Sequence, residues 1–336
     1  MALKFKVAGK TDIGLVRSGN EDFLHLDKEH QVFAVCDGMG GHQAGEVASM
    51  TASQILSVAF DSFRDELMAD PDLALDRSLP KSGELLLKSI RLANRQIYNK
   101  ASANLNMSGM GTTVVAVALE GNLMSVAHVG DSRAYRVEER RLAPLTMDHS
   151  WVAEMRQKQM LGADEELEGV GKNVITRALG VRENVEIDYR LITVAPGDKF
   201  MLCSDGLCGF ADDEDIHDVT AKSGDIERMC KDLVQLANDR GGADNVTVIG
   251  IEILETGESS FNEIEVFTLP AEGQELLDVE DRWLSRIDKH LQQDSAGPPS
   301  KSKGRGGGSS RFWLFLIFVL FIVVAFVVIK FMSTGE

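Results

Sequence analysis

Short apolar runs rich in β-branched residues alternate with longer segments of helical periodicity along the first 254 residues. Runs of this kind predict strands, here over 32–36, 113–120, 123–130, 134–138, 199–203 and 245–254. Apolar positions spaced three and four residues apart predict helices over 43–65, 83–104, 150–160 and 225–239. The Gly121-Asn122 pair between two of the strands predicts a hairpin turn. Strands grouped in hairpins, with helices inserted in pairs, favour an α+β domain over a regular βαβ alternation.

The pattern changes after residue 254. Residues 255–311 are polar, with a possible short amphipathic helix over 276–293 and a glycine- and serine-rich stretch that is typical of a flexible linker. Residues 312–329 are eighteen apolar residues without a charge, which reaches the length of about 17–25 residues that crosses a bilayer. A helix buried in a soluble core is the alternative, but such helices seldom stay apolar on every face. We therefore predict a transmembrane helix over 312–329, followed by a short tail over 330–336.

The distribution of charge predicts the orientation of the anchor, and the net charge limits the classes of binding partner. Four basic residues precede the apolar segment and only Lys330 follows it directly, so the positive-inside rule puts residues 1–311 in the cytoplasm. The chain of 336 residues has a formal net charge of −17. An acidic protein repels a phosphate backbone, which argues against nucleic acid as a partner and is compatible with bound divalent cations. The four cysteines form no CxxC pair, so the sequence predicts neither a zinc site nor a redox site.

Four aspartates stand where a predicted strand meets a loop: Asp37, Asp131, Asp205 and Asp244. Each alone is typical of a turn, but four in one antiparallel core could converge on one end of a sheet. Such a cluster of carboxylates would repel itself strongly unless a cation shielded it. An all-oxygen site suits Mg²⁺ or Mn²⁺, and two such ions can activate a water near neutral pH. The carbonyl of Gly38, next to the first aspartate, could be a further ligand.

The stretch "GLVRSGNEDF" contains an arginine close in sequence to two acidic residues. The guanidinium of Arg17 could hold two phosphate oxygens in a fork, although a salt bridge to a nearby acid is equally compatible with the spacing. Glu21 or Asp22 could hold a metal-bound water, and a solvated charge pair is the alternative for both.

Eight short motifs in a fixed order make the pattern specific. They are "RSGNED", "DGMGGH", "GMGTT", "GDSR", "DHS", "ITRALG", "SDGL" and "DNVT", and they span residues 10–254. Each alone is weak, but together the chain resembles the metal-dependent serine/threonine protein phosphatases of type 2C, the PPM family, in their bacterial form. The resemblance implies a central antiparallel β-sandwich flanked by helices, an αββα arrangement, with a metal cleft at one end. It also implies a catalytic domain over 1–254 with a flap over about 151–174.

The resemblance further implies which residues bind the metals. Asp37, the Gly38 carbonyl, Asp205 and Asp244 match the ligands of two catalytic Mn²⁺ or Mg²⁺ ions. Asp131 and Asp205 match positions that hold a third ion in bacterial members.

Other positions match residues around the metals. Arg17 matches the phosphate-binding arginine, and Asp22 matches an acid that contacts metal-bound water. Many eukaryotic relatives carry a histidine as general acid where this chain has Met39. A thioether cannot donate a proton, so His42, a metal-bound water or no group at all would take that role. His42 as a plain helix-start residue is equally compatible with the sequence.

The function implied is hydrolysis of phosphoserine and phosphothreonine in proteins by direct attack of a metal-bridging water, without a phosphoenzyme. The expected partners are phosphorylated proteins, a serine/threonine kinase that the enzyme opposes, and the membrane, with a monomeric catalytic domain. The alternatives are a membrane scaffold that binds phosphoproteins with little activity, and an enzyme with one narrow target. The tail could also bind a partner helix in the membrane. His128 and His149 are expected to be structural, the latter at the entry to the flap.

Overall fold

Two antiparallel sheets stacked as a sandwich form the centre of the computed structural model, as predicted. The structure describes residues 3–40, 43–75, 78–158, 174–271 and 274–295. Residues 1–289 form one compact unit. Every strand pair in it is antiparallel, which agrees with the hairpin-rich sequence pattern.

The two sheets are built from strands that are distant in sequence. The order in the five-stranded sheet is β1 (Lys4–Asp12), β11 (Val246–Glu255), β10 (Lys199–Cys203), β7 (Arg133–Val137) and β8 (Leu142–Pro144). The order in the seven-stranded sheet is β12 (Ile264–Leu269), β9 (Ile187–Thr193), β6 (Leu123–Val129), β5 (Val114–Glu120), β3 (Val32–Met39) and β2 (Asp22–Asp27), with β4 (Gly111–Thr112) paired to β3.

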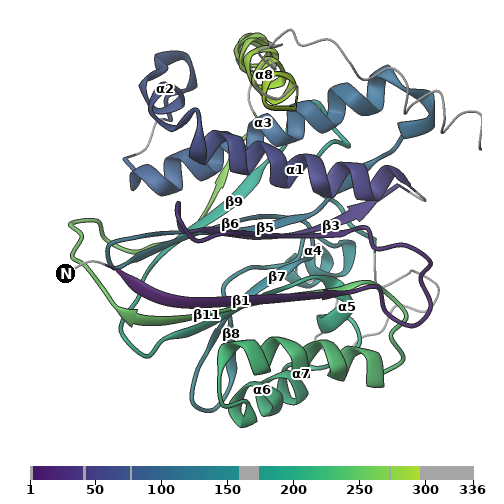
Figure 1. The fold of residues 1–336 in the computed structure, drawn as a ribbon, viewed down its shortest axis with the longest axis vertical. Coiled ribbons are helices and arrows are strands. Elements are labelled where there is room, and N and C mark those ends of the chain that lie inside the picture. Colours follow the sequence, from purple (N-terminus) through teal and green to yellow (C-terminus); the bar gives the residue numbers. More distant parts are fainter. Residues whose placement is uncertain (1–2, 41–42, 76–77, 159–173, 272–273, 296–336) are drawn as a thin grey trace, which may run out of the picture. The chain divides into compact units, whose positions relative to one another are not determined.

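Helices cover the outer face of each sheet (Figure 1). The seven-stranded sheet is covered by α1 (Gln43–Asp61) and α3 (Lys81–Ala103), with α2 (Arg64–Ala69) and the 3-10 turns Pro71–Leu73 and Leu105–Met107 beside them. The five-stranded sheet is covered by α7 (Ile226–Asp239), against which α6 (Asp213–Lys222) packs. Two short helices, α4 (Trp151–Gln157) and α5 (Asp205–Cys208), follow β8 and β10 in the chain.

The apolar alternation along the strands explains why two layers of core form. In β11, Ile249, Ile251 and Ile253 belong to the core between the sheets, whereas Val246 and Val248 belong to the core under α7. Successive side chains of a strand point to opposite faces, so a strand with both sets apolar must be covered on both sides.

The six predicted strands and four predicted helices are present, with ends shifted by a few residues. Several shorter or more polar elements were not predicted, among them the strands β1, β2 and β9 and the helix α6. β1 and β2 lie at sheet edges, where polar side chains interrupt the apolar pattern of a strand. Their sequences, KFKVAGKTD and DFLHLD, show this mixture.

The segment after residue 254 differs from the prediction of a polar linker over 255–311. Part of it forms β12, which pairs with β9, and α8 (Gln274–Ser295) extends the short helix expected over 276–293. Leu277, Trp283 and Ile287 of this helix are buried. The Trp283 indole N–H also donates to Asp70 at 2.7 Å. The strand and the first four turns of the helix therefore belong to the folded unit, because together they bury apolar side chains that a linker would expose.

Three predictions fall outside the described residues. They are the transmembrane helix over 312–329, the residue His42, and most of the flap, since only 151–158 and 174 of its range are described. Within the part of the chain that the structure describes, no helix is long and apolar enough to cross a membrane.

Candidate metal centre

Five aspartates from separate strand ends meet at one end of the sandwich. Asp22 and Asp37 are direct partners in the β2–β3 ladder. Asp131 follows β6, Asp205 follows β10, and Asp244 precedes β11. Charge repulsion links Asp37 to Asp22, Asp131 and Asp205, and links Asp205 to Asp244. The predicted ligands Asp37, Asp131, Asp205 and Asp244 and the predicted water-contacting Asp22 therefore do form one cluster.

Thr113 fixes the strand that carries Asp37. The Asp37 N–H donates to the Thr113 hydroxyl at 3.1 Å, and the Thr113 N–H donates back to the Asp37 carbonyl at 2.8 Å. The hydroxyls of Thr113 and Ser132 lie 2.7 Å apart, which connects Asp37 to the loop of Asp131. Thr113 was not predicted to have a role, although it lies in the quoted motif "GMGTT".

Ser204 orients Asp22. Its hydroxyl donates to Oδ2 of Asp22 at 2.7 Å and accepts the Thr247 N–H at 3.0 Å. This links the seven-stranded sheet, through Asp22, to β11 of the five-stranded sheet. Ser204 was not among the predicted site residues. The sequence signal that could have identified it is its position as a small polar residue directly before Asp205 in "SDGL".

Glycine is required where the backbone passes close to the cluster. A Cβ atom on Gly38 would lie 2.2 Å from the Gly45 carbonyl oxygen, and one on Gly206 would lie 1.9 Å from the Asn245 carbonyl oxygen. Neither position accommodates a side chain without movement of the main chain. The Gly38 N–H donates to the Glu21 carbonyl at 3.1 Å. The glycines after Asp37 and Asp205 thus allow the close packing that brings those acids together.

The environment of the acids opposes their ionisation in the absence of a cation. Burial is the largest cause, and it raises the pKa of Asp22 and that of Asp131 to about 7, with nearby carboxylates adding to the rise. Burial and its carboxylate neighbours also raise the pKa of Asp37 well above its ordinary value, and burial raises the pKa of Asp205. A bound cation would remove the penalty by pairing with the charges.

Two carboxylate oxygens support a cation site directly. Oδ1 of Asp22 and Oδ1 of Asp131 are buried without a hydrogen-bond partner. An unsatisfied buried acceptor costs free energy unless a donor or a cation completes it. The potential ligands are all oxygen atoms, which suits Mg²⁺ or Mn²⁺ and does not suit zinc or copper. The residues therefore fit the divalent ions expected from the sequence.

Arg17 lies at the edge of this cluster. Its Nη2 donates to Oδ2 of Asp244 at 2.7 Å, and about half of its side chain is exposed. Glu21 and Asp37 also contribute to the raised pKa of the guanidinium, behind Asp244. A salt bridge to one of the nearby acids Glu21 and Asp22 was one reading of the sequence; the bridge that the structure shows is instead to Asp244, an acid of the cluster.

A second group of titratable residues lies behind the Asp131 loop. Among the described residues, His128, His149 and Asp188 form a trio with potential ligand atoms within 4.8 Å of one another. The imidazole rings of His128 and His149 are stacked with their centroids 4.5 Å apart. Both histidines were expected to be structural, and their connection to Asp188 was not predicted.

Hydrogen bonds within this trio favour a structural role. Nδ1 of His149 accepts the Gly130 N–H at 3.1 Å, which leaves Nε2 protonated to donate to Asp188 at 3.1 Å. Nε2 of His128 donates to the Met147 carbonyl at 2.8 Å. The coordinating lone pairs of His149 are therefore in use, and the ring supports the residue directly before Asp131.

The carboxylate of Asp188 is already engaged in hydrogen bonds as well. It accepts hydrogen bonds from Thr268 at 2.7 Å and from Arg177 at 3.1 Å. Its hydrogen bond with His149 helps to hold the pKa of Asp188 below its ordinary value, against the opposing effect of burial. A carboxylate with three donors already in place has little capacity left for a metal ion.

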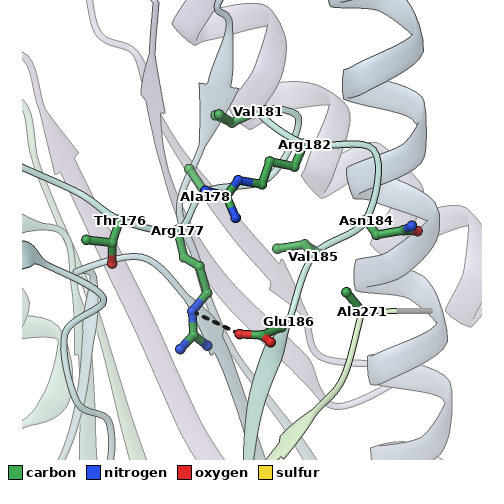
Figure 2. A pocket seen from close by; sticks show the side chains of 9 residues that line it. All are labelled: Thr176, Arg177, Ala178, Val181, Arg182, Asn184, Val185, Glu186 and Ala271. Atoms are coloured by element: carbon green, nitrogen blue, oxygen red, sulfur yellow. Dashed lines mark ion pairs between the residues drawn. The ribbon is translucent and has the colours of Figure 1, made fainter. Parts of the chain in front are cut away.

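A pocket of about 150 Å³ lies along the segment that follows the flap (Figure 2). Arg177 and Glu186 point toward each other in it, with Nε and Oε2 3.8 Å apart. None of its lining residues is a predicted site residue; they are Thr176, Arg177, Ala178, Val181, Arg182, Asn184, Val185, Glu186 and Ala271. The pocket is therefore distinct from the aspartate cluster.

Comparison with known proteins agrees with this geometry. Residues 17–245 match the family model described as protein phosphatase 2C. The chain is 34% identical over 246 residues to the serine/threonine phosphatase stp of Listeria welshimeri, which covers 72% of this chain and 94% of that protein. A crystal structure of the Mycobacterium tuberculosis serine/threonine phosphatase PstP is 31% identical, with a TM-score of 0.65 over 75% of this chain and 99% of that one.

A related structure contains metal ions. The catalytic domain of PstP in complex with two manganese ions is 30% identical and covers 76% of this chain and all of that one, with a TM-score of 0.64. The sequence match, the sandwich and the aspartate cluster agree with one another. The chain belongs to the protein phosphatase 2C family.

Proposed function

We propose that this chain hydrolyses phosphoserine and phosphothreonine in proteins, using Mn²⁺ or Mg²⁺ at the aspartate cluster. The observation that carries the proposal is the convergence of five aspartates, two of which have a buried oxygen without a partner. The serine/threonine phosphatases to which the chain is similar support the substrate class.

We assign two ions to Asp37, the Gly38 carbonyl, Asp205 and Asp244. Asp131 and Asp205 would hold a third ion. When bound, the ions would activate a water for attack on phosphorus and neutralise charge on the phosphoryl group.

The residues around the ions position the substrate and the water. Arg17 is exposed enough to bind phosphate oxygens while Asp244 keeps its guanidinium at the site. Asp22 is held by Ser204 through Oδ2, so its unpartnered Oδ1 can accept a proton from an attacking water. His42 remains a candidate proton donor to the leaving serine or threonine oxygen, in competition with a water.

The test is release of phosphate from a phosphothreonine peptide by the purified chain, with Mn²⁺ and then with excess EDTA. Release that depends on Mn²⁺ would support the proposal. No release with Mn²⁺ or Mg²⁺, together with retained binding of the phosphopeptide, would favour the scaffold alternative.

The apolar segment 312–329 leads us to propose a single-pass anchor with the phosphatase unit in the cytoplasm as a monomer. An anchor raises the local concentration of the enzyme near membrane-bound kinases and their substrates, so we infer that it opposes a serine/threonine kinase there. Deletion of residues 301–336 should move the protein from the membrane fraction to the soluble fraction with its activity retained. A deletion variant that stays with the membrane would contradict the anchor.

The anchor and a partner-binding helix make different demands on the sequence of this segment. Replacement of residues 312–329 by polyleucine preserves hydrophobicity but removes any specific contact surface. Retained function of that variant in cells would support a simple anchor, and loss of function with normal membrane insertion would support a partner helix.

A further inference from the structure

Apolar side chains are exposed on the loop between β1 and β2. Leu15 and Val16 are each 69% exposed, and Ile13 is 38% exposed. Single exposed apolar residues are ordinary, but a group of three within four residues points to a contact surface. Arg17, the proposed phosphate-binding residue, comes directly after this group in the chain.

The loop is held by hydrogen bonds on both sides of its tip. The Leu15 N–H donates to the Gly242 carbonyl at 2.7 Å. The side-chain amide of Asn245 donates to the carbonyls of Ile13 and Gly19, at 2.9 Å each. The exposed side chains are thus presented on a fixed backbone. This lowers the entropic cost of ligand binding, because the loop does not have to become ordered when a ligand binds.

The loop also packs closely against Asp244 of the aspartate cluster. Gly14 has φ +80°, and a Cβ atom there would lie 2.2 Å from the carbonyl oxygen of Asp244. Asp244 in turn accepts the hydrogen bond from Arg17. A polypeptide whose phosphorylated residue is bound at Arg17 would therefore pass the loop that carries Leu15 and Val16.

We propose that Leu15 and Val16 bind an apolar side chain next to the phosphorylated residue in protein substrates. The occupant is the substrate polypeptide, because Val16 directly precedes the proposed phosphate-binding Arg17 in the chain and the loop that carries both packs against Asp244. This inference rests on the proposed phosphatase function. It predicts that the enzyme selects phosphorylation sites by their apolar neighbours and not only by the phosphate.

The experiment compares two phosphothreonine peptides of equal charge, one with leucine and one with serine on both sides of the phosphothreonine. The full chain should favour the leucine peptide by about tenfold in kcat/KM, mainly through KM. In the double variant Leu15→Ser/Val16→Ser the ratio between the two peptides should fall close to one. Because the ratio is measured within each protein, it does not depend on the amount of active enzyme.

Leu254→Ser is the matched control, since Leu254 is also exposed, at 40%, but lies at the end of β11 remote from Asp244. It should keep the ratio of the original chain. An unchanged ratio in the double variant, or no preference in the original chain, would overturn the inference. Loss of self-association in the double variant with an unchanged ratio would assign the surface to a second copy and would also overturn it.

The proposed phosphatase function is tested separately with p-nitrophenyl phosphate, a small ester that contains no peptide and so cannot contact the apolar subsite. If the original chain hydrolyses this ester with Mn²⁺ but treats both peptides alike, only the apolar subsite is wrong. If it hydrolyses none of the three substrates, the phosphatase function itself fails.

Discussion

The guanidinium of Arg17 donates to the carboxylate of Asp244 at 2.7 Å, although the two residues are 227 positions apart in the chain. The contact joins the loop before β2 to the loop before β11. It places the proposed phosphate-binding group against a proposed metal ligand. Substrate binding and metal binding are therefore expected to depend on each other at this point.

Arg17→Ala should lower kcat/KM for a phosphothreonine peptide by roughly ten- to hundredfold, because charged hydrogen bonds to phosphate are lost. Arg17→Lys should recover only part of this loss, since an ammonium cannot form the two-pronged contact. Steady-state kinetics at saturating Mn²⁺ measures both effects. Arg228→Ala removes an exposed arginine paired within α7 and should leave the kinetics unchanged; equal effects of the two alanine variants would contradict the assignment.

Asp205→Ala should abolish hydrolysis while the protein stays folded. The mutation removes one carboxylate from a group of mutually repelling acids, so the melting temperature in EDTA should not fall. Thermal melting and phosphate release measured on the same preparation separate the two effects. Asp218→Ala, at an exposed site on α6, is the control for loss of an aspartate. Normal turnover by the Asp205 variant would refute its role as a ligand.

The stability of the metal-free protein should fall as pH rises from about 4 to about 7. Burial raises the pKa of Asp22 and Asp131 to about 7, above the ordinary value of an aspartate. The folded state therefore binds more protons than the unfolded state between about pH 4 and pH 7, and it loses stability as those protons dissociate. Thermal melting in EDTA across this range measures the effect.

Added Mn²⁺ should reverse this dependence, because cations compete with protons for the same carboxylates and bind better as pH rises. Asp131→Asn should flatten the curve in EDTA, since the amide does not ionise. A melting temperature that rises steadily with pH in EDTA would show that other groups dominate.

Arg95 connects α8 to the body of the unit. Its guanidinium donates to Asp281 at 2.8 and 2.6 Å and to Glu183 at 2.7 Å, and the residue is buried. Asp281→Ala should reduce the free energy of unfolding by about 1–3 kcal/mol, because it leaves a buried charge with fewer partners. Urea denaturation of the chain in detergent measures the change.

Arg282→Ala is the matched control for Asp281→Ala. It breaks a salt bridge between α8 and Asp72 whose two side chains are largely exposed, and should change stability by less than about 0.5 kcal/mol. Equal effects of the two variants would show that the Arg95 contacts do not stabilise the position of α8.

The sequence by itself determined much of the candidate site. Asp37, Asp131, Asp205 and Asp244 each follow or precede a strongly apolar strand, which indicated that they could converge, and the order of the motifs that contain them gave the resemblance to the family. The strands themselves were predictable because they are apolar on both faces, which is the pattern of a buried strand. The comparisons confirmed the family that these motifs indicated.

Only the tertiary structure decided which residues support the cluster. Ser204, Thr113 and His149 act through hydrogen bonds to residues in other strands or loops, and such partners leave no periodic signal in the sequence. The same holds for β12, whose polar sequence predicted a linker, and for the packing of α8, which the sequence predicted only as a possible short helix within that linker. Their apolar side chains are few, and they became part of the fold because β9 and α3 present an edge and a face for them to cover. Local pattern therefore fixes where an element forms, whereas long-range packing decides what it contacts.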